Sequence, residues 1–164
     1  VVDGKRGFGN KKCLPAGPLR ENISTGFKRA DALIIVGQCL YKFDSFPKHL
    51  KIIRSTLMPV ETGMNWKEGK YLAFAGIADP EKFFVTLRSM GANVIDFVAL
   101  SDHQKLNGQI LKRLEHRAET AQAQLVTTEK DAVRLPDTFR KKVLSLPVRI
   151  EFENKDALED LFNN

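Results

Sequence analysis

Apolar and polar residues follow one another along the chain in a pattern that predicts strands and helices in turn. Apolar runs of strand length lie at residues 32–36, 50–53, 71–75, 94–100, 125–127 and 148–152. Apolar side chains recur at helical spacing in two further segments, namely Phe83, Phe84, Leu87 and Met90, then Ile110, Leu111, Leu114 and Ala118. Strands separated by helices predict an α/β fold, with a mostly parallel sheet and helical crossovers.

Residues typical of helix ends mark the boundaries of these segments. Asp79 followed by Pro80 suits an N-cap and a first helical position, and Gly91 suits a C-terminal stop. Asn107 is placed to cap the second helix, and residues 156–162 predict a short terminal helix.

The pattern divides the chain into two expected parts, residues 1–60 and residues 61–164. Residues 4–31 are rich in Gly, Pro, Lys and Arg, which predicts a long basic loop, and loops of this length are often functional. Residues 58–70 predict an irregular connection. The first residues, 1–4, contain no Met and no signal-peptide pattern, and they resemble the end of a buried strand. We therefore expect the chain to be a piece of a larger protein.

Composition excludes several classes of protein. Of the 164 residues, 43% are hydrophobic and 28% charged, which is typical of a globular domain and not of a disordered or fibrous chain. No apolar run approaches the roughly 18 residues of a membrane-spanning helix. His and Cys never occur at metal-ligand spacing, so we predict no metal site, and Cys13 and Cys39 are expected to be reduced thiols.

The net charge of +6 is concentrated in the first part of the chain. Residues 1–60 carry 11 Lys or Arg against 4 Asp or Glu, a local charge of +7, whereas residues 61–164 carry 15 against 16. This asymmetry indicates an anionic partner, such as phosphate, nucleic acid or an acidic membrane surface, although a soluble basic face explains it equally well. Only Phe8 and Phe27 are interleaved with the charges, which argues against nucleic acid as the partner.

Three polar loops follow predicted strands and are expected to share one edge of the sheet, because ligands gather at the carboxyl ends of parallel strands. They are residues 76–79, 101–105 and 128–131. The second loop contains Asp102 and His103. A His there can act as a general base or hold a carboxylate in its working state. The alternative is an exposed loop His beside an Asp.

The third loop combines a hydroxyl, two carboxylates and an ammonium group directly after a buried strand; its residues are Thr128, Glu129, Lys130 and Asp131. Two interpretations stay open. Either Thr128 or Asp131 caps a helix, or the four side chains form a polar cluster that orders the ligand edge or touches substrate.

The basic loop offers its own candidates for anion binding. Arg20 stands beside Glu21, and the fork of an Arg side chain suits phosphate, while Arg6 and Asn10 add further donors. The chain has no G-x-x-x-x-G-K-[ST] motif and no G-x-G-x-x-G motif, so it contains no recognisable triphosphate site.

Read together, these segments resemble the tetraacyldisaccharide 4'-kinase family of Gram-negative bacteria. The resemblance is carried by Val2-Asp3-Gly4, Arg6-Gly7-Phe8-Gly9-Asn10, Leu14-Pro15-Ala16-Gly17-Pro18-Leu19-Arg20-Glu21, Ala73-Phe74-Ala75-Gly76-Ile77, Pro80-Glu81, Phe83-Phe84, Asp102-His103 and Thr128-Glu129-Lys130-Asp131-Ala132-Val133. Lys11 stands where the family usually has Gly, and Ala78-Asp79 replaces a common Gly-Asn. The matching segments run in order over nearly the whole chain.

The resemblance implies phosphoryl transfer from ATP, with Mg²⁺, to the 4' hydroxyl of an acylated glucosamine disaccharide in lipid A biosynthesis. It implies that the chain is the carboxy-terminal part of a two-part enzyme like the P-loop kinases. The amino-terminal half, which carries the P-loop and the magnesium carboxylates, is then missing. Residues 1–60 would complete that kinase domain, and residues 61–164 would form the carboxy-terminal α/β domain.

The resemblance also assigns roles to residues. It places the catalytic His of the family at His103 and an acidic residue near the active site at Glu21, with Arg20 beside it. Arg6 and Asn10 are further candidates for substrate binding. Asp102, Thr128, Glu129, Lys130 and Asp131 are candidate supporting residues.

These implications give a leading hypothesis and an alternative. The leading hypothesis is a portion of the lipid kinase that is inactive alone and acts peripherally at the cytoplasmic face of the bacterial inner membrane. The alternative is a non-catalytic α/β module that binds anions or a membrane surface.

Overall fold

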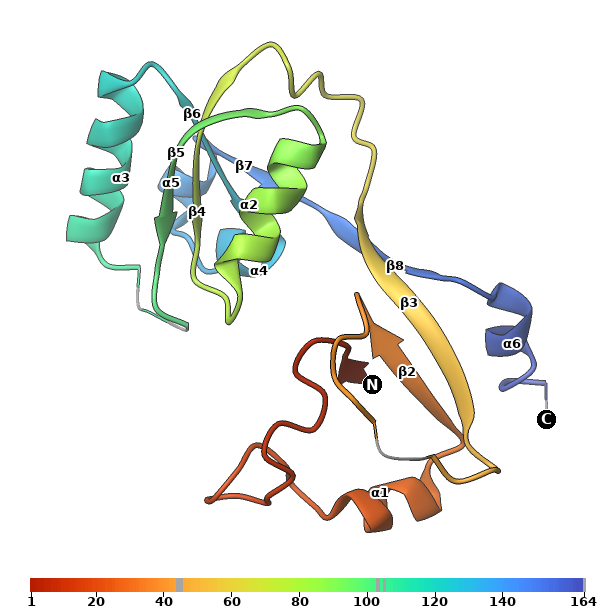
Figure 1. Cartoon of the computed structure of the whole chain (residues 1–164). Helices are drawn as coiled ribbons and strands as arrows, with labels where there is room; N and C mark the ends of the chain where they lie inside the picture. The colour runs from red at the N-terminus through yellow and green to blue at the C-terminus, as the bar shows by residue number, and fades with distance from the viewer. Residues whose placement is uncertain (44–45, 103, 105, 164) are drawn as a thin grey trace. The chain divides into compact units, whose positions relative to one another are not determined.

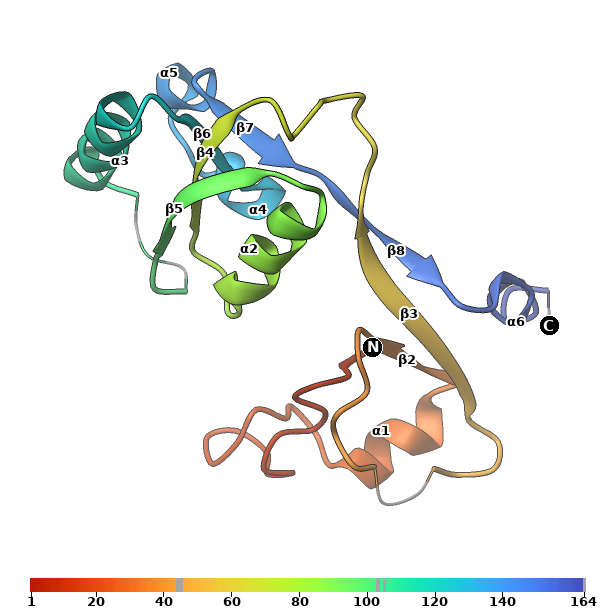
Figure 2. The ribbon, with the colours of Figure 1, turned by 45° about the horizontal axis from the view of Figure 1, so that its top comes forward.

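The structure, a computed structural model, describes residues 1–43, 46–102, 104 and 106–163 (Figure 1). The chain forms two compact units. The first consists of Val1–Met58 with Arg149–Asn164, and the second of Pro59–Val148. Figure 2 shows that the chain passes between the units twice, after Met58 and after Val148. The predicted boundary after residue 60 concerns the domains of a longer enzyme and stays a prediction.

The second unit contains a four-stranded parallel sheet in the order β5-β4-β6-β7. Its strands are β4 (Lys70–Ala75), β5 (Asn93–Ala99), β6 (Gln124–Thr128) and β7 (Val143–Leu146). Its helices are α2 (Pro80–Ser89), α3 (Gly108–Thr120), α4 (Glu129–Ala132) and α5 (Asp137–Arg140). This unit confirms the predicted α/β class with helical crossovers. The pattern did not predict α5 and β7, which have four residues each.

Strand β4 is buried on both faces, because α2 covers one face of the sheet and α3 the other (Figure 1). Ala73 and Ala75 point to the α2 side, where they meet Phe83, Phe84 and Leu87. Leu72 and Phe74 point to the α3 side, where they meet Leu111, Leu114 and Ala118. This alternation follows from the period of two in a strand. Burial of one such large side chain contributes about 1.5–3 kcal/mol.

The predicted helix ends are largely confirmed. The Asn107 side chain accepts a hydrogen bond from Ile110 N–H at 3.0 Å and so caps α3. Asp79 occupies the N-cap position of α2 with Pro80 as the first helical residue, but its side chain makes no capping bond. Gly91 follows α2 with a φ of +83°, the left-handed conformation that favours glycine after a helix.

The first unit contains a four-stranded sheet in the order β1-β2-β3-β8. Its elements are β1 (Val2–Asp3), α1 (Ile23–Arg29), β2 (Ala32–Val36), β3 (Lys51–Pro59), β8 (Val148–Phe152) and α6 (Lys155–Glu159). β1 pairs with β2 and β2 with β3, both in parallel. The predicted loop of residues 4–31 is wrong in one respect, because seven of its residues, Ile23–Arg29, form α1.

The core of the first unit is small and aromatic. Leu33, Ile35 and Leu50 are buried in it, and partly buried aromatic side chains pack against them. The Ser55 hydroxyl is also buried and donates to the Ile35 carbonyl at 3.2 Å, so that this polar group has a partner inside the sheet.

We expect Phe84→Ala to lower the free energy of unfolding of the second unit by about 3–5 kcal/mol, because it leaves a cavity between α2 and the sheet. Val85 is the next residue of α2 and is 59% exposed, so Val85→Ala should cost about 0.5 kcal/mol or less. Urea unfolding followed by the fluorescence of Trp66, which packs in the same core, measures both. Equal losses in the two variants would contradict this packing.

Candidate functional site

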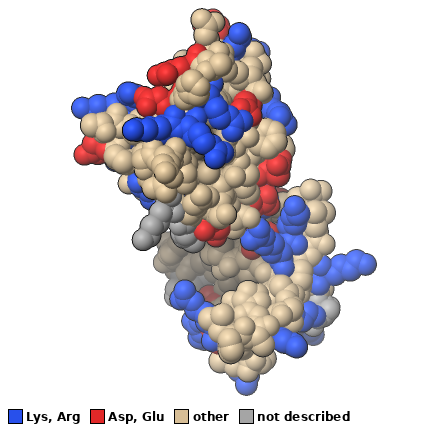
Figure 3. Space-filling model, turned by 90° about the vertical axis from the view of Figure 1, so that its left-hand side faces the viewer, with Lys and Arg blue, Asp and Glu red and all other residues tan. Residues whose placement is uncertain are grey.

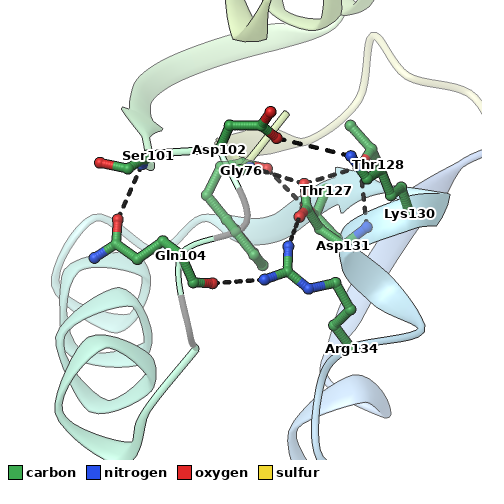
Figure 4. Close-up of polar contacts among 10 residues, drawn as sticks. Gly76, Ser101, Asp102, Gln104, Thr127, Thr128, Lys130, Asp131 and Arg134 are labelled. Atoms are coloured by element: carbon green, nitrogen blue, oxygen red, sulfur yellow. Dashed lines mark hydrogen bonds and ion pairs between the residues drawn. The ribbon is translucent and has the colours of Figure 1, made fainter. Parts of the chain in front are cut away.

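The carboxyl ends of β4, β5 and β6 lie side by side at one edge of the second sheet, because these strands are parallel neighbours. The sequence predicted this gathering, and the described residues confirm it. Gly76 follows β4, Ser101 and Gln104 follow β5, and Thr128 ends β6. Figure 4 shows their polar contacts.

The carboxylate of Asp131 lies at the centre of this edge and is fully buried. Its Oδ2 atom accepts hydrogen bonds from Gly76 N–H at 2.8 Å and from the Thr128 hydroxyl at 2.9 Å. Its Oδ1 atom accepts from Nη1 of Arg134 at 3.1 Å. A buried carboxylate is tolerated only when donors and an opposite charge compensate it. Asp131 therefore joins the residue after β4 to its own segment, residues 128–134.

Gly76 leaves room for this approach. A Cβ atom at position 76 would lie 3.2 Å from Oδ1 of Asp131 and 3.5 Å from the Ser101 carbonyl oxygen. The second polar group near this edge, the buried Thr127 hydroxyl, donates to the Phe74 carbonyl at 2.7 Å. The edge is thus closely packed and internally hydrogen-bonded.

The structure supports both interpretations of the Thr128–Asp131 segment. Thr128 is the N-cap of α4, since its hydroxyl oxygen accepts from Asp131 N–H at 3.1 Å. The same hydroxyl donates to the Asp131 carboxylate, which ties the cap to the polar cluster. A contact of these residues with substrate stays a prediction.

Arg134 is the site residue that the sequence did not reveal. Its Nη2 atom donates to the Gln104 carbonyl at 2.6 Å, while Nη1 binds Asp131. Gln104 in turn forms a tight turn with Ser101, in which each backbone N–H of the pair donates to the other residue at 2.9 Å. The only signal in the sequence is an Arg three residues after an Asp at a capped helix start.

Exposed charges line the rim of the same edge. Lys130 Nζ lies 3.7 Å from Asp102 Oδ1, and both side chains are about half exposed, so this ion pair contributes little to stability. Glu129 is exposed, and its Oε2 atom accepts from Val148 N–H at 3.3 Å. The predicted catalytic residue His103 lies outside the described residues, and its role stays a prediction.

In the first unit, two of the predicted binding residues lie in a loop held by its own side chains. The Asp3 carboxylate accepts from the backbone N–H groups of Lys5 and Arg6, each at 2.9 Å. Asn10 donates to the Ala16 carbonyl at 2.9 Å and accepts from Lys12 N–H at 3.1 Å. Asn10 therefore fastens the loop, whereas the Arg6 side chain is exposed.

Glycine and a left-handed residue shape this loop. A Cβ atom on Gly17 would lie 2.2 Å from Oδ1 of Asn10 and 2.3 Å from the Lys12 carbonyl oxygen, so the loop requires glycine there. Lys11 adopts a φ of +61°, the left-handed region, at the position where the resembled family usually has glycine. The loop thus keeps a backbone shape that glycine would adopt more easily.

Glu21 is bound by Arg29 of α1, and Arg20 beside it in the sequence is exposed. The hydrogen bond from Arg29 holds the pKa of the Glu21 carboxyl below its usual value. A lowered pKa keeps Glu21 charged over a wider range, so this pair is complete at neutral pH and is lost only as the pH falls through that lowered pKa.

The two aromatic residues interleaved with the basic loop are packed against other aromatic rings. Phe8 makes edge-to-face contacts with Phe27, Tyr41 and Phe43, at centroid distances of 5.6, 6.2 and 5.7 Å. Rings held in this way stabilise the core of the first unit.

Candidate metal ligands do not gather in the described part of the chain. Among the described residues, no group of three or more His, Cys, Asp or Glu side chains comes together. The carboxylate of Glu21 is taken by Arg29, and that of Asp131 by three donors. No helix in the described part of the chain is both long and apolar enough to cross a membrane.

Charge is distributed differently over the two units. Figure 3 shows one face, on which Lys and Arg predominate over the first unit, whereas both signs are mixed over the second. The first unit as a whole carries +4, because residues 1–58 contribute +7 and Arg149–Asn164 carry 2 Lys or Arg against 5 Asp or Glu. An exposed basic surface attracts anions but does not select one.

Comparisons with known proteins give the family. A family model described as LpxK, tetraacyldisaccharide-1-P 4'-kinase, matches residues 1–164. A tetraacyldisaccharide 4'-kinase of Dinoroseobacter shibae is 46% identical over 164 residues, covering 96% of this chain and 49% of the relative. That of Jannaschia sp. is 45% identical, covering 97% and 50%. The chain therefore spans about half the length of the curated relatives it matches.

A solved structure supports the fold. The "apo" form of LpxK from Aquifex aeolicus, in complex with ATP, aligns with a TM-score of 0.62 and 23% sequence identity. The alignment covers 93% of this chain and 48% of that one. The family match, the related enzymes and this likeness agree with the sequence motifs, and the chain belongs to the tetraacyldisaccharide 4'-kinase family, LpxK.

Proposed function

We propose that this chain supplies the carboxy-terminal part of an ATP-dependent kinase that phosphorylates the 4' hydroxyl of a tetraacyl glucosamine disaccharide in lipid A biosynthesis. The observation that carries the proposal is the continuous 46% identity, over nearly the whole chain, to a relative named for this reaction. We propose that the chain alone is inactive, because its sequence lacks the P-loop motif that binds a triphosphate.

The part of the relatives that the chain does not match would bind ATP and Mg²⁺. Two features support this division. The sequence lacks the P-loop motif, and the described carboxylates do not gather into a metal site. That part would pack against the sheet of the first unit, because hydrophobic side chains on its strands are exposed, among them Ile52 of β3 and Ile150 of β8. Residues 61–164 would form the carboxy-terminal domain.

The residues of this chain would position groups for the transfer. Phosphoryl transfer depends mainly on positioning and on neutralising charge. His103, next to Asp102 in the sequence, would assist removal of the proton from the attacking hydroxyl. Arg20 and Arg6 would attract the anionic substrate, Glu21 would lie near the active site, and Asn10 would keep their loop in shape.

The substrate is an acylated lipid, so the enzyme would work at a membrane surface. We propose a peripheral position at the cytoplasmic face of the bacterial inner membrane. The supporting observation is the exposed basic side chains of the first unit, which an acidic lipid surface attracts within about one Debye length.

The proposal is tested with a fusion enzyme, in which the part of the Dinoroseobacter shibae relative that this chain does not match is joined to the complete chain. We expect the fusion enzyme to transfer phosphate from ATP to the tetraacyl disaccharide, and the chain by itself to show no turnover. Thin-layer separation of ³²P-labelled lipid measures both. Turnover by the chain alone would refute the assignment of the ATP site to the other part, and an inactive but folded fusion enzyme would count against the kinase proposal.

In the fusion enzyme, His103→Ala should lower kcat by roughly two to four powers of ten, because general acid–base assistance contributes that much. His116→Ala is the matched control, since His116 is exposed on α3, and it should leave kcat unchanged. Initial rates at saturating ATP and lipid give the comparison. A near-normal kcat for His103→Ala would show that this residue is only an exposed loop His.

The exposed basic loop also favours the second candidate, a non-catalytic module that binds anionic surfaces. Cosedimentation with vesicles of phosphatidylglycerol and phosphatidylcholine separates the two. We expect binding that rises with the phosphatidylglycerol content and weakens with Arg20→Ala, whereas Arg140→Ala, which changes an exposed Arg paired with Asp137, leaves it unchanged. Vesicle binding by a fusion enzyme without kinase activity would favour the module, and no binding would contradict the membrane proposal.

A further inference from the structure

A guanidinium group links Gln104, which follows β5, to the buried carboxylate of the carboxyl edge. Arg134 donates to Asp131 with Nη1 at 3.1 Å and to the Gln104 carbonyl with Nη2 at 2.6 Å (Figure 4). Asp131 belongs to the segment after β6, and Gln104 to the loop after β5. Asp131 is 3 residues from Arg134 in the sequence, and Gln104 is 30 residues from it. The hydrogen bond to Gln104 is therefore a long-range contact.

We propose that Arg134 is a positioning residue for phosphoryl transfer, which acts by fixing Gln104 and, through it, Ser101 after β5. The inference rests on the proposed function, because Asp102, a candidate supporting residue, lies between these two residues in the sequence. Arg134 does not need to touch substrate for this role. It sets the place of Gln104 relative to Gly76 and Asp131, which are themselves joined by a hydrogen bond of 2.8 Å.

The chemistry of the contact requires an Arg. Two nitrogens of the planar fork reach two oxygens in different segments at the same time. The anchor is rigid, because Asp131 is the only charged side chain that is buried among the residues the structure describes, and its other oxygen is held by Gly76 and Thr128. A Lys side chain carries a single ammonium group, which would bind only one of the two oxygens, that of Asp131 or that of Gln104, with good geometry.

The chain contains a second Asp–Arg ion pair with a spacing of three residues, Asp137 with Arg140. Arg140 binds Asp137 three residues earlier, as Arg134 binds Asp131, but both side chains of that pair are largely exposed. Arg140 is therefore the matched control. Substitution of either Arg by Met removes the donors and keeps an apolar stem.

The first test measures how firmly Ser101 and Gln104 are held, without any kinase assay. Amide hydrogen exchange of the complete chain should become about tenfold faster at Ser101 and Gln104 in Arg134→Met, because their turn is no longer held. Arg140→Met should leave these amides unchanged. Unchanged exchange in Arg134→Met would overturn the inference, and this readout is independent of whether the chain belongs to a working kinase.

The second test separates positioning from stability in the fusion enzyme. Arg134→Met should lower kcat by about ten- to a hundredfold, with a change in KM for the lipid of about twofold or less, since misplacement of a reacting group affects turnover. Arg134→Lys should recover part of kcat. The double variant Asp131→Asn with Arg134→Met removes the lone buried charge, so its Tm should exceed that of Arg134→Met while its kcat stays low.

The outcomes are distinct. A kcat that recovers together with Tm in the double variant would show that Arg134 is only structural and would overturn the inference. A kcat that stays low while Tm recovers supports it. If the fusion enzyme without substitutions has no kinase activity, the proposed function fails, and the exchange measurement still decides whether Arg134 fixes Gln104 and Ser101.

Discussion

Burial of the Asp131 carboxylate constrains every described loop at the carboxyl edge of the second sheet. A buried charge without partners costs several kcal/mol, so the folded unit must bring donors to both of its oxygens. Gly76 supplies a backbone N–H, Thr128 a hydroxyl and Arg134 a guanidinium group. Gly76 lies 55 residues from Asp131 in the sequence, whereas Thr128 and Arg134 each lie three residues from it. The hydrogen bonds that compensate the Asp131 carboxylate therefore fix the positions of Gly76 and Arg134 at this edge.

The parallel sheet makes this arrangement possible. Helices α2 and α3 cover its two faces, which leaves the ends of the strands as the place where polar side chains collect. Inside the edge the polar groups are satisfied by one another, and at the rim Asp102 and Lys130 face solvent. A closely packed interior with a charged rim suits a reaction that depends on positioning. The basic loop of the first unit adds attraction for anions but has no comparable buried anchor.

Local patterns predicted the elements of the second unit well where the signal was long or capped. Helix α3 has three buried residues at helical spacing and an Asn cap, and it begins where expected. Elements of four residues, such as α5 and β7, carry too few positions to show a period. Helix α1 was missed because Gly26 and three β-branched or hydroxyl residues weaken its helical signal within a segment rich in Gly and Pro. The partner of Glu21 is Arg29 rather than its sequence neighbour, a choice that the turn of α1 decides.

The sequence by itself determined the α/β class, the gathering of three loops at one edge and, through its motifs, the family. These properties depend on local periodicity and on short runs of residues, which can be read directly from the amino-acid sequence. The tertiary structure alone decided that Asp131 is buried, that Arg134 joins it to Gln104, and that β8 returns to the sheet of the first unit. Such contacts join residues that are distant along the chain. Their energy depends on burial and geometry, which exist only after the chain has folded.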